Sequence, residues 1–112
     1  MVLQIDIDLV NFTGALMTRM NGNGPATVNN DVEAEWSATS PDGAGDLAVT
    51  FAYTVPGGNR AFNFIARVWS DGRTAHDGVN PTGYNSILTL ADRGESGNVH
   101  LWDFEVVCQD DD

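Results

Sequence analysis

The feature of this sequence that most constrains its fold is an alternation of apolar and polar residues with a period of two. Successive side chains of a β-strand point to opposite faces of a sheet, so an apolar row of this kind covers a hydrophobic core. In the segment 61-AFNFIARVWSDG-72 the row consists of Phe62, Phe64, Ala66 and Val68. Similar rows occur in residues 3–9, 32–38, 47–55 and 101–108. The pattern predicts an all-β protein.

Turn-forming residues separate these segments and predict how they connect. In 55-VPGGN-59, Pro56 fixes the φ angle of a turn, and Gly57 and Gly58 can adopt positive φ. This turn predicts that 47–55 and 61–69 are antiparallel neighbours. A second strand is expected over 15–20, a long loop over 70–85 and a short strand over 87–90.

Together the segments predict an antiparallel β-sandwich of about seven short strands, either immunoglobulin-like or jelly-roll-like, with a small barrel as the alternative. We expect residues 1–112 to form a single domain. The inward rows predict the following core residues: Ile5, Ile7, Trp36, Val49, Phe51, Phe62, Phe64, Val68, Trp102, Phe104 and Val106. Cys108, the single cysteine, continues an inward row and is expected to be a buried thiol.

Charge excludes two classes of partner. The formal net charge is -11, and all five basic residues are arginines. Nucleic acids and anionic membranes bind mainly through positive side chains, so we expect neither as a partner. The sequence has no apolar run of membrane-spanning length, and the start MVLQIDIDLV has no features of a signal peptide. We therefore expect synthesis in the cytoplasm without an export signal.

Catalytic motifs are not apparent in the sequence. His76 and His100 are its two histidines, and neither lies in a metal-binding motif such as HExxH. Nucleophile motifs such as GxSxG and SxxK do not occur. We expect no enzymatic activity, no catalytic residues and no cofactor.

Calcium is the one metal that the acidic loops suggest. Calcium binds several oxygen ligands, and Asp- and Gly-rich loops offer them. No loop has the order of ligands of an EF-hand, so these loops indicate calcium only weakly. The weak candidates are Asp42, Asp46, Asp71 and Asp77.

The second row of 61–69 indicates a protein interface. It contains Ile65, Arg67 and Trp69, and aromatic residues and arginine are enriched at interface cores. If 61–69 also pairs with the last strand, this row lies beside Leu101, Glu105 and Val107, and Arg67 can pair with Glu105. Alternatively, a loop over 73–85 folds across this face and makes it interior.

Two functions are compatible with these observations. The first is a structural or assembly protein, such as a capsid-decorating or virion protein, which binds other protein subunits or itself and forms a homo-oligomer or part of a larger assembly. The second is a carbohydrate-binding module or lectin, with or without calcium, in which aromatic residues stack on sugar rings. Its contact residues would be Trp69 and Tyr84, or Trp36, with Asp71, Asp77 and Asn80 binding hydroxyl groups.

Overall fold

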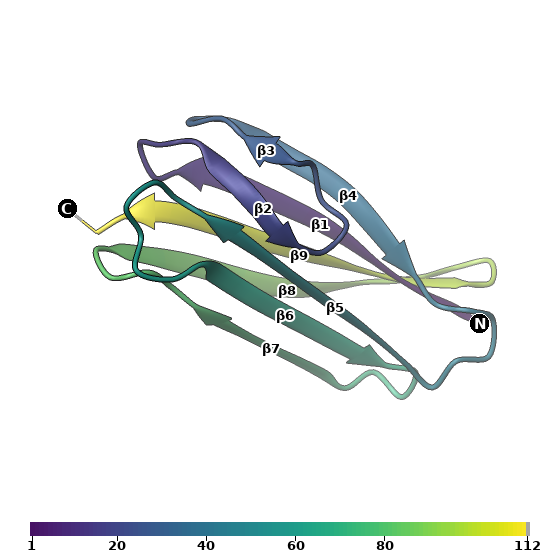
Figure 1. Cartoon of the computed structure of the whole chain (residues 1–112). Coiled ribbons are helices and arrows are strands. Elements are labelled where there is room, and N and C mark those ends of the chain that lie inside the picture. The colour runs from purple at the N-terminus through teal and green to yellow at the C-terminus, as the bar shows by residue number, and fades with distance from the viewer. Residues whose placement is uncertain (112) are drawn as a thin grey trace.

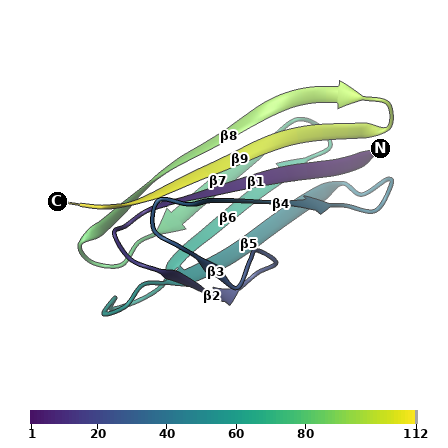
Figure 2. The same ribbon diagram turned by 90° about the horizontal axis from the view of Figure 1, so that it is seen from above.

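A computed structural model describes residues 1–111, which form nine strands and no helix. One sheet contains four strands in the order β4-β1-β9-β8, and the other contains five in the order β3-β2-β5-β6-β7. The two sheets pack face to face (Figures 1 and 2). The strands are β1 (Val2–Phe12), β2 (Met17–Asn21), β3 (Thr27–Val28), β4 (Glu33–Thr39), β5 (Asp46–Thr54), β6 (Phe62–Trp69), β7 (Thr74–Val79), β8 (Tyr84–Ser96) and β9 (Val99–Asp110).

This architecture confirms the predicted all-β sandwich, and it is not a closed barrel. Most neighbouring strands are antiparallel, but β1 and β9 run parallel at the centre of the four-stranded sheet. Their register pairs Ile5 with Trp102 and Ile7 with Phe104, so inward rows from the two ends of the chain lie side by side. No local turn signal links such distant segments, which is why the sequence did not indicate this pair. None of the described residues forms a helix that could cross a bilayer.

The core lies between the sheets and consists largely of the predicted residues. Phe51 is at its centre, with the rings of Trp36, Phe64 and Phe104 at centroid distances of 5.1, 5.5 and 6.1 Å. Cys108 is buried as predicted, and burial raises the pKa of its thiol far above the ordinary value. Trp36 and Val49 are only half-buried, because both lie at an open edge of the sandwich.

The hairpin between β5 and β6 confirms the turn prediction. The two strands are antiparallel, with Phe51 opposite Phe64. Gly57 has a φ of 74°, which is the left-handed conformation that glycine adopts without steric cost. The Gly58 amide donates to the Val55 carbonyl at 3.1 Å and closes the turn.

Two predictions for the C-terminal half are wrong. Residues 73–85 do not fold over the outer row of β6, because Thr74–Val79 forms the edge strand β7 and widens the sheet. A strand at a sheet edge can be exposed on both faces and then has no apolar row, so its sequence resembles that of a loop. Strand β8 is longer than the predicted 87–90 because a register shift between Asp92 and Gly94, with Gly94 at a φ of 85°, carries it past apparent turn residues.

Candidate interaction surfaces

The six predicted interface residues do not form one surface. Ile65, Arg67 and Trp69 belong to β6 in the five-stranded sheet, whereas Leu101, Glu105 and Val107 belong to β9 in the four-stranded sheet. All six lie outside the inward rows of their strands, so the two groups are on opposite sides of the sandwich. The neighbours of β6 are β5 and β7, not the last strand. The expected pairing of Arg67 with Glu105 is therefore wrong.

The outer face of the five-stranded sheet, here called the β6 face, consists mainly of short side chains around a few apolar ones. Ile65 is 40% exposed and lies between Thr50 of β5 and Asp77 of β7. Ile65 and Val79 line the same shallow hollow of about 120 Å³. The neighbouring exposed positions are Ala48, Asn63 and Ala75. Because few long side chains project from it, this face is suited to close contact with another flat surface.

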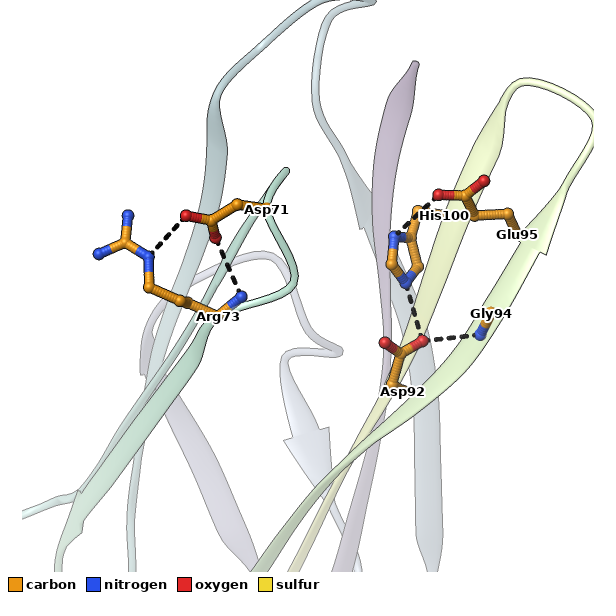
Figure 3. Close-up of polar contacts among 6 residues, drawn as sticks. All are labelled: Asp71, Arg73, Asp92, Gly94, Glu95 and His100. Atoms are coloured by element: carbon orange, nitrogen blue, oxygen red, sulfur yellow. Dashed lines mark hydrogen bonds and ion pairs between the residues drawn. The ribbon is translucent and has the colours of Figure 1, made fainter.

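Trp69, at the end of β6, is held by arginines of its own chain. The guanidinium groups of Arg67 and Arg73 each lie over the indole, 4.8 Å from its centroid. Arg67 pairs with Asp46 at 2.6 Å, and Arg73 pairs with Asp71 at 2.8 Å (Figure 3). The Arg73 amide, followed by its guanidinium, holds the pKa of Asp71 below the ordinary value. Trp69 is therefore a preorganised, half-buried aromatic group at one end of the β6 face.

Charge is distributed very unevenly between the two sheets. Residues 46–79, which make up β5, β6, β7 and their connecting turns, carry three arginines and three aspartates, so their formal charge is zero. The four strands of the other sheet carry nine carboxylates and one arginine. The β6 face can thus approach another protein surface with less repulsion than the net charge of -11 implies.

The outer face of the four-stranded sheet is strongly acidic. Carboxylate oxygens of Asp8, Glu33 and Glu35 lie within 4.8 Å of one another. Burial, reinforced by the adjacent Glu35, raises the pKa of Asp8 above its ordinary value. Sequence analysis missed this cluster because it arises from the pairing of β1 with β4, which places Asp8 opposite Glu35. The outward acidic rows of residues 4–8 and 33–37 were its only sequence signal.

The four weak calcium candidates do not converge on one site. Asp42 pairs with the N-terminal amine, Asp46 with Arg67 and Asp71 with Arg73. Asp77 accepts a hydrogen bond from the Gly78 amide in β7. Among residues 1–111 the acidic cluster on β1 and β4 is the only group of three or more ligand side chains, and it includes none of these four. The four residues therefore do not form one side-chain cluster, and calcium binding by these loops stays a prediction.

The predicted sugar-contact residues are also dispersed. Trp69 is at the C-terminal end of β6, whereas Tyr84 packs against Phe62 at the opposite end of that strand, with ring centroids 5.7 Å apart. Asn80 accepts a hydrogen bond from Ser86 near Tyr84. Trp36 lies on β4, which is at the opposite edge of the four-stranded sheet from β8, the strand of Tyr84. These residues do not form one concave site with aromatic and acidic groups together.

A polar cluster ties the β8–β9 hairpin together. His100 is buried and stacks on Trp102, with ring centroids 3.8 Å apart. Its Nε2 lies 2.8 Å from Asp92 Oδ1, and its Nδ1 lies 3.7 Å from Glu95 (Figure 3). The hydrogen bond with His100, followed by that from the Gly94 amide, lowers the pKa of Asp92. We interpret this cluster as structural because its polar atoms contact one another.

This cluster predicts a contribution to acid sensitivity. A carboxyl group whose pKa is lowered by folding stabilises the native state above its unfolded pKa, and this stabilisation is lost as the pH falls. Asp92→Asn should therefore be less stable than the wild type near neutral pH, and the difference should shrink as the pH falls below about 4, the ordinary pKa of an aspartate. Urea unfolding across this range measures it, with Asp77→Asn as a control for the loss of one charge. A difference that stays constant with pH would contradict this account.

Comparison with known proteins gives no family assignment. No protein-family model matches the chain, and no curated protein is significantly similar to it.

Proposed function

We propose that this chain is a non-enzymatic assembly protein that docks on other protein subunits, including copies of itself, through the β6 face. A capsid-decorating or virion protein is the kind of protein that we have in mind. The observation that supports this proposal most strongly is the combination of exposed Ile65 and the arginine-flanked Trp69 on one face with the zero formal charge of residues 46–79. Interface cores are enriched in aromatic residues and arginine and depleted of unpaired charge.

The contrast in charge between the two outer faces indicates which of them docks on a partner. An acidic face stays hydrated and repels a second copy of itself, whereas a face without net charge repels a second copy much less. Two copies that meet through their β6 faces would keep both acidic faces in water. In such an arrangement Arg67 and Arg73 would cover apolar surface with their stems while their ion pairs remained at the rim.

A pair of matched variants tests the proposed surface. Ile65 lies on the β6 face, and Ile87, which is 55% exposed, belongs to β8 in the other sheet. Ile65→Asp should place an uncompensated charge in the interface and weaken association by about 2 kcal/mol or more, while Ile87→Asp should leave it unchanged. Sedimentation velocity of both variants measures the association. Equal effects, or a larger effect of Ile87→Asp, would contradict the proposed surface.

A further inference from the structure

The methionine Met20 has different surroundings from the other methionines of the chain. Met20 is 67% exposed, more than any other large hydrophobic side chain among residues 1–111. Met17 lies earlier on the same strand, β2, and is fully buried in the core. The strand therefore carries one thioether inside the sandwich and one in contact with solvent.

A β-bulge gives Met20 its position on β2. Arg19 pairs with Tyr53 of β5. Asn21 pairs with Ala52, which is the next residue along β5. The register therefore shifts by one residue, and Met20 is the extra residue of the bulge. An extra residue of this kind has no partner across the ladder, and the bulge changes the direction of the side chains near it.

Met20 lines a hollow on the β6 face, at the side where β2 flanks β5 (Figure 1). The hollow has a volume of about 450 Å³, and its lining includes Met20, Thr54, Ala61, Asn63 and Val79. Asn63 and Val79 also line the smaller hollow beside Ile65. The two hollows adjoin, so the β6 face extends from Ile65 to Met20.

The chemistry of the larger hollow suits a contact with another protein surface. Within residues 1–111 its lining contains no carboxylate, and Arg60 is its one charged side chain. Arg60 is held in place because its Nε donates to the Asn80 carbonyl at 2.8 Å. A methionine side chain is flexible and polarisable, so Met20 can adapt its shape to an apolar partner.

Oxidation of the Met20 thioether would make this part of the face more polar. A sulfur lone pair attacks one oxygen of hydrogen peroxide, the O–O bond breaks, and a sulfoxide and a molecule of water form. The sulfur is oxidised by two electrons and the peroxide is reduced by the same two, and reductases can restore the thioether. A docked partner would strip water from the polar sulfoxide, which is unfavourable.

We propose that Met20 is a site of reversible oxidation by peroxides, and that its oxidation weakens docking through the β6 face. The effect on docking rests on the proposed function, whereas the oxidation site does not. Oxidation leaves the core intact because buried Met17 is not accessible to the oxidant. It occurs on the undocked chain, since a partner on the β6 face would cover the Met20 thioether.

Peptide mass spectrometry after brief treatment with hydrogen peroxide tests the oxidation site. Met20 should form the sulfoxide at least about tenfold faster than Met17 in the native protein, because susceptibility follows exposure. In denaturant, where both thioethers are in water, this difference should disappear. A native protein in which Met17 reacts as fast as Met20, or in which Met20 does not react, would overturn the inference.

Sedimentation velocity of treated and untreated protein tests the effect on docking. Oxidation should raise the dissociation constant of the wild type by about tenfold or more. Met20→Leu keeps an apolar side chain of similar size without the sulfur, so it should associate like the wild type both before and after treatment. An equal loss of association in treated Met20→Leu would assign the effect to another residue and overturn the inference.

The outcomes distinguish this inference from the proposed function. If Ile65→Asp weakens association but oxidation of Met20 does not, docking through the β6 face stands and its regulation by Met20 is overturned. If the untreated wild type does not associate at any concentration, self-association through this face is contradicted together with its regulation, and mass spectrometry alone decides the oxidation site. Denaturant unfolding of the oxidised protein should match that of the untreated protein, and a large loss of stability would also overturn the inference.

Discussion

Replacement of Phe51 by alanine is expected to reduce the free energy of unfolding by about 3–5 kcal/mol. Phe51 is 1% exposed and contacts aromatic rings from β4, β5, β6 and β9, so it joins the two sheets. No neighbouring ring can fill the space without leaving its own contacts, and a cavity adds to the lost transfer free energy. Denaturant unfolding followed by tryptophan fluorescence measures the change.

Phe12 provides the matched control for this prediction. It is 51% exposed at the end of β1, so Phe12→Ala removes the same atoms from a position outside the core. Its effect should stay within about 0.5 kcal/mol. Similar losses for the two variants would contradict the description of a core centred on Phe51.

Replacement of Trp69 by alanine is expected to affect association more than folding. Loss of an aromatic anchor at an interface costs about 2 kcal/mol or more, which corresponds to roughly a 30-fold weaker dissociation constant. The two cation–π contacts with Arg67 and Arg73 are at the surface, so their loss should reduce the free energy of unfolding by about 1–2 kcal/mol. Light scattering measures the first quantity and denaturant unfolding the second.

Trp69→Phe separates the contribution of an aromatic face at position 69 from that of the larger size of the indole. Phenylalanine keeps an aromatic face for both arginines, so this variant should retain most of the association and most of the stability. If Trp69→Ala instead costs about 3–5 kcal/mol of unfolding free energy, the indole belongs to the monomer core. That result would remove Trp69 from the proposed interface.

Local signals in the sequence were sufficient for much of the fold. Alternation with a period of two identifies a half-buried strand, and the Pro56–Gly58 turn correctly joined β5 to β6. Strand β7 was missed because an edge strand with exposed Thr74, Ala75 and His76 has no inward apolar row. The parallel pairing of β1 with β9 depends on contacts between the two ends of the chain, and no local pattern encodes it.

The candidate surfaces were less predictable because they depend on strand order. The outward row of β6 was recognised from Ile65 and Trp69, but its assumed neighbour β9 belongs to the other sheet. The segment of β5 from Asp46 to Thr50 has no neighbour on its β2 side because β2 ends early, which becomes apparent only when the lengths of paired strands are compared. Similarly, the separation of charge between the two faces appears only after residues are assigned to sheets.

The molar mass of the wild type in solution tests the proposed assembly through the β6 face most directly. Light scattering over a concentration series at low and high salt should give a multiple of the 12.0 kDa chain mass, with stronger association at high salt because the remaining like charges are screened. Ile65→Asp should need a roughly 30-fold higher concentration to reach the same mass under the same conditions. A wild type that remains at 12.0 kDa at every concentration and salt level would contradict self-association through this face.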